Sequence, residues 1–207
     1  MYTPTLLITA LAAAAASAQQ RPTSKTFTLR AFPYSGTDLT PSIENYELNA
    51  VASDPSDPYP CSRVASLSPP GQGGLWYANG TYSVAVSPGV LGPDARFTCA
   101  GIQAAAAGTA TVPATWPVTV DCGPGTEGIS VQISSGTGAP VLSSDTLGWM
   151  ACPASQLGRP VDFDDATIVL VPKADGQRRL GGCAEVMLVA YCVDGEGGEG
   201  AVEVPCV

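Results

Sequence analysis

The 207-residue chain contains no histidine. This absence excludes Ser–His–Asp and Cys–His catalytic arrangements and histidine-ligated zinc and copper sites, and it removes the commonest general base. Charged residues are also scarce, at 13%, against roughly 25% in typical soluble domains. Since no nucleophile or cofactor motif stands out either, we expect no catalytic residue, no metal site, no cofactor and no enzymatic activity.

Basic residues are few as well. Nine Lys and Arg stand against 18 Asp and Glu, which gives a formal net charge of −9. Proteins that bind nucleic acid need a basic face against the phosphates, so this class of partner is nearly excluded. The chain also lacks any run of 18 consecutive apolar residues after its N-terminus, so we expect no membrane span.

The N-terminus carries a short apolar run over residues 6–16, followed by Ala16-Ser17-Ala18. A short apolar segment that ends in a small-x-small triplet is typical of a cleaved secretory signal peptide. No Lys or Arg precedes the run, so a buried N-terminal helix is the alternative. We predict a signal peptide over 1–18, a mature N-terminus at Gln19 and a secreted, extracellular protein. Residues 19–25 are expected to form a short tail and residues 26–207 a single β-sandwich domain.

Period-2 alternation of apolar and polar residues dominates the chain after this segment. It indicates half-buried strands, whose apolar members are Phe27, Leu29 and Ala31; Tyr82, Val84 and Val86; Val118, Val120 and Cys122; and Ile129, Val131 and Ile133. Residues 166–171 and 186–191 are apolar on both faces, as in central strands. Only residues 102–107 suggest a helix. We therefore predict an all-β fold, an antiparallel β-sandwich or barrel stapled by disulfides.

Asn79-Gly80 separates two of the predicted strands and is a strong signal for a tight hairpin turn. Asn79-Gly80-Thr81 is also an N-glycosylation sequon, so we predict a glycan on Asn79. Trp76 and Tyr77 precede this turn. They form a possible sugar-stacking platform if exposed, and core or cross-strand contacts if buried.

Two acidic segments and one glycine motif are candidate sites. The acidic residues 162–165 and the set Glu196, Glu199 and Glu203 could supply oxygen ligands or a carboxylate pair, although acidic residues beside Gly and Pro are usually solvated loops. Residues 123–128 match G-x-G-x-x-G, but a strand pattern follows where a dinucleotide site needs a helix, so a turn is expected.

Several stretches resemble one known family. They are Phe27-Thr28-Leu29 with residues 46–50, residues 117–128, Gly148-Trp149-Met150-Ala151-Cys152, and residues 182–189. Residues 182–189 read G-C-A-E-V-M-L-V, which is similar to a family pattern "S-C-A-x-V-x-L-V". In this order they resemble a family of small secreted fungal proteins known only as a domain of unknown function, over roughly residues 26–192. The resemblance implies a fungal secreted protein and a Cys152–Cys183 disulfide, and it carries no catalytic residue. Phe97-Thr98-Cys99 also resembles the Alternaria-type fungal allergens, which are secreted disulfide-linked β-barrels.

The chain has seven cysteines and no C-x-x-C pair, which indicates a disulfide framework with one cysteine left over. Residues 201–204 alternate and can return as an antiparallel strand, so we expect Cys192–Cys206. Among the remaining cysteines we choose Cys61–Cys99, with Cys122 as the free thiol on a buried face. The alternative is Cys99–Cys122, with Cys61 free to cross-link two chains. We expect a monomer.

For function, the sequence favours a secreted, non-enzymatic structural or interaction protein, effector-like, whose partner is an unknown extracellular protein or a cell-wall polysaccharide. The first alternative is a carbohydrate- or cell-wall-binding module that uses Trp76 or Tyr77. The second is a histidine-free glycosidase, which requires two carboxyl groups facing each other across a cleft.

Overall fold

The structure is a computed structural model, and it describes residues 21–52, 63–79, 84–86, 100–104, 116–122, 125–157, 164, 166–198 and 200–207. The predicted signal peptide lies outside these residues. So do Cys61, Cys99 and the side chain of Cys122.

Antiparallel strands make up nearly all the regular structure of the described residues, which confirms the all-β prediction. The strands are β1 (Thr23–Ser24), β2 (Thr26–Pro33), β3 (Glu47–Ala52), β4 (Arg63–Ser68), β5 (Trp76–Asn79), β6 (Val84–Val86), β7 (Ala100–Gln103), β8 (Thr119–Cys122), β9 (Ile129–Ile133), β10 (Pro140–Ser144), β11 (Leu147–Pro153), β12 (Ile168–Ala174), β13 (Ala184–Val193), β14 (Ala201–Val202) and β15 (Val204–Pro205). A short 3₁₀ turn, η2, spans Ala154–Leu157. Among the described residues, no helix is long and apolar enough to cross a membrane.

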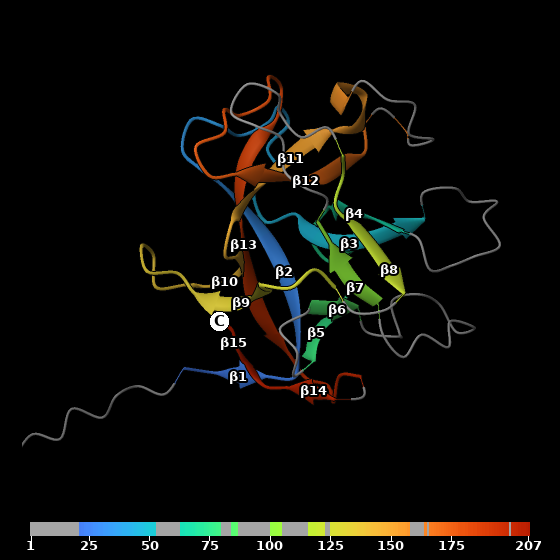
Figure 1. Ribbon diagram of the computed structural model, residues 1–207, viewed down its shortest axis with the longest axis vertical. Coiled ribbons are helices and arrows are strands. Elements are labelled where there is room, and N and C mark those ends of the chain that lie inside the picture. The colour runs from blue at the N-terminus through green and yellow to red at the C-terminus, as the bar shows by residue number, and fades with distance from the viewer. Residues whose placement is uncertain are drawn as a thin grey trace, which may run out of the picture.

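Six of the strands close into a barrel in the order β2, β3, β4, β12, β11, β13 and back to β2. The longest seam joins β2 to β13, where Thr26 pairs with Val193 and the register continues to Pro33 opposite Val186. Figure 1 shows these two strands running side by side down the middle of the molecule. A closed barrel leaves these strands without a free edge, which is one way to prevent edge-to-edge aggregation.

A second ring of strands shares β2, β3 and β4 with the barrel. The two rings diverge along β4. Ser66 and Leu67 at its C-terminal end pair with β12 of the barrel, whereas Arg63 and Val64 at its start pair with β8 of the second ring. Val118 sits at this fork, because its carbonyl accepts from the N–H of Ala65 (2.9 Å) and its own N–H donates to the carbonyl of Leu170 (2.8 Å). From β8 the ring continues through β7, β6 and β5 back to β2.

The predicted alternation is seen directly in the core. Phe27, Leu29 and Ala31 are fully buried inside the barrel. The first expected central strand buries both faces, since Leu170 belongs to the main core while Val169 lies in a smaller cluster outside the barrel wall. The second does so only in part, because Met187 and Tyr191 on its outer face are half-buried. That smaller cluster is made by Val64, Met150, Cys152, Ala154, Leu157, Val169, Val171 and Cys183.

Three local expectations were wrong. Asn79-Gly80 is not a two-residue turn, since Ala78 pairs with Val84 where that turn would pair it with Thr81. Asn79 instead extends β5 and pairs with Ala201 of β14. Ile102 and Gln103 lie in strand β7, not in a helix. Ile133 is 44% exposed although it alternates with buried residues, because it ends an outer hairpin.

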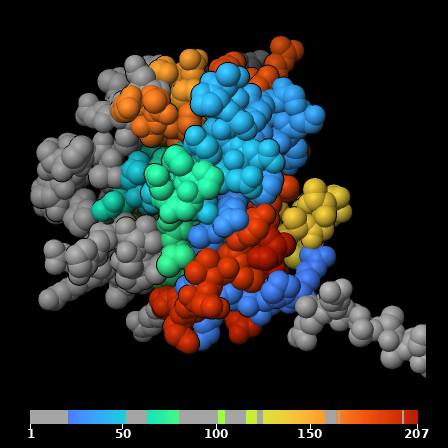
Figure 2. Space-filling model, turned by 180° about the vertical axis from the view of Figure 1, so that it is seen from behind, coloured from blue at the N-terminus to red at the C-terminus, as the bar shows by residue number. Residues whose placement is uncertain are grey.

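The two ends of the described chain are held together. β1 pairs with β15, and the N–H of Cys206 donates to the carbonyl of Pro22 (3.1 Å). Cys206 also forms a disulfide with Cys192 at the end of β13. In Figure 2 the red C-terminal residues and the blue N-terminal residues form one continuous surface at the lower end of the molecule.

Candidate functional site

One opening of the barrel, called the mouth here, is formed by the last residues of β2, β4 and β11 and the first residues of β3, β12 and β13. Glu47 of β3 lies opposite Ser68 of β4, and Ile168 of β12 lies opposite both Leu67 of β4 and Pro153 of β11. The start of β13 and the end of β2 meet there as well. Barrel mouths are a common place for ligand cavities, because a packed barrel interior ends there and side chains from distant segments surround the opening.

A cavity of about 870 Å³ occupies this mouth, within the roughly 300–1,000 Å³ range of small-molecule sites. Its floor includes Ile43 and Leu67, which belong to the main core. The other apolar residues that line it are Leu39, Pro41, Tyr46, Val51, Pro69, Pro153, Ala166 and Ile168. The site is therefore a largely apolar hollow with a few polar groups around it.

The loop between β2 and β3 forms one wall and is fixed by Asp38. Its Oδ1 accepts from the N–H groups of Leu39 (2.8 Å) and Ile43 (3.1 Å), and its Oδ2 accepts from the hydroxyl of Ser42 (2.5 Å). Partial desolvation tends to raise the pKa of Asp38. The three hydrogen bonds to the charged form outweigh this effect and hold the pKa below its ordinary value of 3.8. Asp38 is thus an ionised group that organises the loop.

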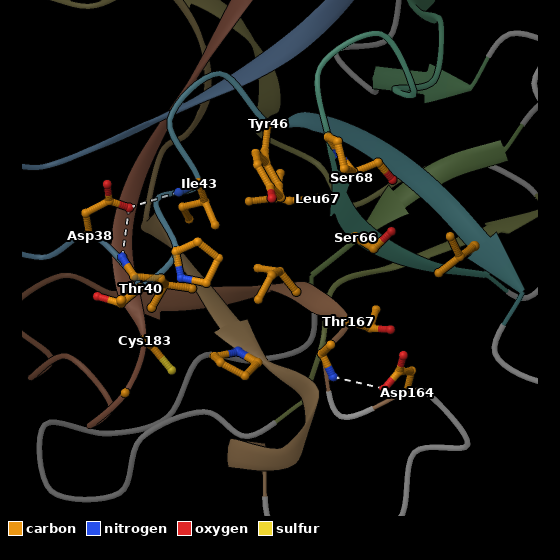
Figure 3. Close-up of a pocket in the computed structure, with 18 of the residues that line it drawn as sticks. Asp38, Thr40, Ile43, Tyr46, Ser66, Leu67, Ser68, Asp164, Thr167 and Cys183 are labelled. Atoms are coloured by element: carbon orange, nitrogen blue, oxygen red, sulfur yellow. Dashed lines mark hydrogen bonds between the residues drawn. The ribbon is translucent and has the colours of Figure 1, made fainter.

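The segment before β13 forms a second wall, next to Cys183 (Figure 3). Arg179 Nη1 donates to the carbonyl of Cys183 (2.7 Å) and, more weakly, to that of Thr37 (3.4 Å). A disulfide joins Cys183 to Cys152 of β11. The disulfide and Arg179 together connect this wall both to the barrel and to the loop between β2 and β3.

The third wall lies on the β4 and β12 side, where Ser66, Thr167 and Asp164 are found. Figure 3 shows these three side chains on one side of the cavity, with Asp38 on the other. Asp164 Oδ1 accepts from the N–H of Ala166 (3.2 Å), and its carbonyl accepts from the N–H of Thr167 (2.8 Å). These contacts keep Thr167 at the cavity edge.

A family described as a domain of unknown function, DUF7907, matches residues 24–192. The chain belongs to the DUF7907 family. No curated protein matches the chain, and no solved structure matches it either.

The DUF7907 match covers the six barrel strands and the cavity and ends at Cys192. The strands β14 and β15 lie beyond the matched residues, yet they pair with β5 and β1 inside the fold. The match therefore includes Cys192 but not its disulfide partner Cys206.

The sugar-platform hypothesis for Trp76 and Tyr77 is wrong. Both rings have an exposed fraction of 0%, so neither can stack on a sugar. Trp76 packs in the main core and donates from Nε1 to the carbonyl of Leu48 (3.1 Å). Tyr77 is covered by Gly198 of the glycine-rich loop. Strand β5 is itself interior, since it pairs with β2 and β14 along one edge and with β6 along the other.

The other candidate residues are dispersed. Asn79 is half-buried at the end of β5. Glu196 pairs with Lys25 (3.1 Å) and Glu203 accepts from the hydroxyl of Thr23 (2.8 Å), while Glu199 and most of residues 162–165 lie outside the described residues. The G-x-G-x-x-G segment is followed directly by strand β9. None of these described groups lines the barrel-mouth cavity except Asp164.

The two disulfides in the described residues join Cys152 to Cys183 and Cys192 to Cys206, which are two of the expected pairs. The pairing of Cys61 and Cys99 and the free state of Cys122 fall outside the described residues and stay predictions.

Apart from Asp164 and Cys183, sequence reasoning missed the residues that line the cavity. Ser66 lies within a strand and Asp38 within a loop, and neither belongs to a recognisable motif. The one local signal was Asp38 with Ser42 four residues later, a pattern able to cap a turn through side-chain hydrogen bonds.

Proposed function

We propose that this DUF7907 protein is a secreted, non-enzymatic fungal interaction protein that binds a small, mainly apolar molecule in the mouth of its barrel. The observation that carries the proposal is the cavity of about 870 Å³, with a floor of core residues such as Ile43 and Leu67. A concave, mostly apolar site with a few fixed polar groups is the usual form of a ligand site.

Two further observations support action outside the cell. The two disulfides are the kind of cross-link that persists in oxidising compartments. The segment 1–18 has the pattern of a signal peptide. One of the disulfides also borders the cavity through Cys183, so the proposed site depends on a bond that the extracellular environment favours.

The carboxylates at the cavity favour binding over catalysis. A glycosidase acid needs a raised pKa so that it holds a proton near neutral pH. The pKa of Asp38 is lowered instead, because its oxygens accept three hydrogen bonds. Asp164, on the opposite side, supports its own turn through Ala166. Both groups thus serve the loops around the cavity.

The proposal is tested by titrating the secreted protein with N-phenyl-1-naphthylamine, an uncharged dye whose fluorescence rises in apolar sites. We expect saturable binding that Thr167→Trp abolishes, since the indole would occupy the cavity edge. Thr146→Trp is the matched control, because Thr146 is an exposed residue of the turn between β10 and β11, away from the barrel mouth. The proposal fails if the wild type does not bind the dye, or if both variants bind it as the wild type does.

A further inference from the structure

We infer that the ligand of the barrel-mouth cavity is an uncharged, mainly apolar molecule that carries a hydroxyl group, and that Ser66 is its hydrogen-bond partner. The inference rests on the proposed function and adds to it the chemical class of the ligand and the residue that recognises it.

Ser66 is the unusual residue of the cavity. Its exposed fraction is 2%, yet it lines the hollow. Its neighbours across the sheet are Asn49 on β3 and Val169 on β12, and Val169 is fully buried. Among the described residues the Ser66 hydroxyl makes no hydrogen bond, whereas the nearby Ser68 hydroxyl accepts a long one from Asn49 (3.5 Å). The Ser66 Oγ is not one of the fully buried polar atoms without a partner, which are Thr28 Oγ1 and Gln177 Nε2 among the described residues. It therefore keeps some access to the hollow, and a ligand group there can be its hydrogen-bond partner.

A hydroxyl is the group that suits this position best. Ser66 can both donate and accept a hydrogen bond, and Thr167, on the same side of the cavity in Figure 3, offers a second hydroxyl. The Thr167 hydroxyl makes no hydrogen bond within the described part of the chain. A ligand hydroxyl could donate to one of these oxygens and accept from the other, so both of its functions would be satisfied.

The charges around the cavity argue against a charged ligand. Asp38 and Asp164 both line it, and the formal net charge of the chain is −9, so an anion is repelled. Arg179 is the cation among the described lining residues, and its Nη1 already donates to two carbonyl groups. A cation would lose its hydration over the apolar floor formed by Ile43 and Leu67, which is costly without a buried partner.

Three ligands of equal chain length distinguish these cases: decanol, decanoate and decylammonium, each competing with N-phenyl-1-naphthylamine at pH 7. We expect decanol to displace the dye at a concentration at least tenfold below that of either charged ligand. Ser66→Ala should weaken decanol binding by roughly 3–10-fold, as expected for one neutral hydrogen bond, once the dye affinity of the same variant is taken into account. Ser143→Ala on β10 is the matched control, because Ser143 is also a strand serine and lies away from the barrel mouth.

The outcomes separate the two proposals. If the dye does not bind, the proposed function is wrong and this inference with it. If the dye binds but decanoate or decylammonium competes as well as decanol, or if Ser66→Ala and wild type bind decanol equally, the ligand class is wrong while the cavity remains a binding site. Should Ser66→Ala not fold, as judged by circular dichroism, Ser66→Cys keeps the size with a weaker hydrogen-bonding group and makes the same comparison.

Discussion

Gly198 lies so close to the ring of Tyr77 that a Cβ atom added to it would be 2.3 Å from Tyr77 Cζ. Gly197, its neighbour, is similarly restricted by Ala201, at 2.6 Å. The glycine-rich loop between β13 and β14 is therefore a packed cover over a fully buried ring. The contact lies next to the place where β14 pairs with Ala78 and Asn79 of β5.

The first prediction follows from this contact. Gly198→Ala should destabilise the protein by about 1–3 kcal/mol, the usual cost of overpacking, because the added methyl must displace the Tyr77 ring. Gly136→Ala is the control, since nothing lies within 4 Å of its added Cβ and its φ is not positive. Urea unfolding measures both. Equal unfolding free energies for the two variants would show that the loop is not packed on Tyr77.

Many of the strands could be predicted because a strand with one buried face alternates apolar and polar residues, and this pattern is visible in the sequence alone. Phe27, Leu29 and Ala31 show this clearly. The hairpin of β5 and β6 forms as expected, but its register differs from that of a two-residue turn, since Ala78 pairs with Val84. Turn propensity is local and did not indicate that Asn79 also pairs with Ala201, more than 100 residues away. Trp76 was ambiguous for the same reason, since its burial depends on Leu48 of another strand.

The cavity could not be predicted at all, and the reason is geometric. Its walls come from the loop after β2, from β4, and from the segment that leads into β13. Only barrel closure brings these segments together. A serine such as Ser66 within a strand has no sequence feature that separates it from a half-buried serine away from the cavity, such as Ser130.

The second prediction concerns pH. The pKa of Asp38 is below 3.8 in the folded protein, so the unfolded chain binds this proton more readily and acid favours unfolding. The stabilisation is complete well above pH 3.8 and is lost as the pH falls through the folded-state pKa. Asp38→Asn should therefore lose less thermal stability than wild type between pH 7 and pH 3, although it starts lower at pH 7. Melting temperatures of both proteins at pH 7 and pH 3 test this. The wild type and the variant have all other carboxyl groups in common, so a difference in the pH effect is due to Asp38. Parallel losses in the two proteins would exclude a role for Asp38 in acid unfolding.

The third prediction compares the two disulfides. Replacing Cys192 and Cys206 with Ala should lower stability by about 3 kcal/mol, as the chain-entropy relation gives for a loop of roughly 15 residues, and leave dye binding unchanged. Replacing Cys152 and Cys183 should lower stability by a similar or larger amount and also weaken dye binding. The reason is that Cys183 lines the cavity and its carbonyl positions Arg179. Chemical denaturation and dye titration of both double variants provide the comparison. Equal dye affinity in both would mean that the Cys183 wall does not shape the site.

The fourth prediction concerns processing. Secretion from a fungal host should yield a protein that begins at Gln19, with a glycan on Asn79, since the segment 1–18 has a cleavage pattern and residues 79–81 form a sequon. Intact mass before and after endoglycosidase treatment reports both features. Thr81→Ala removes the sequon while keeping Asn79, whose backbone pairs with Ala201. Recovery of the full-length chain inside the cell would contradict cleavage and secretion. If Thr81→Ala changes the mass only by the difference between Thr and Ala, Asn79 carries no glycan.

The last prediction concerns the three cysteines whose pairing is open. Cys152, Cys183, Cys192 and Cys206 are used in two disulfides, which leaves Cys61, Cys99 and Cys122. We expect Cys61–Cys99, with a thiol at Cys122, because β8 alternates with Val118 and Val120 buried and a buried free cysteine behaves as a small apolar residue. Peptide mapping without reduction should then find Cys122 alkylated only after denaturation, in a monomeric protein. A Cys99–Cys122 peptide together with a reducible dimer through Cys61 is the opposite result. It would show that the odd cysteine serves to join two chains.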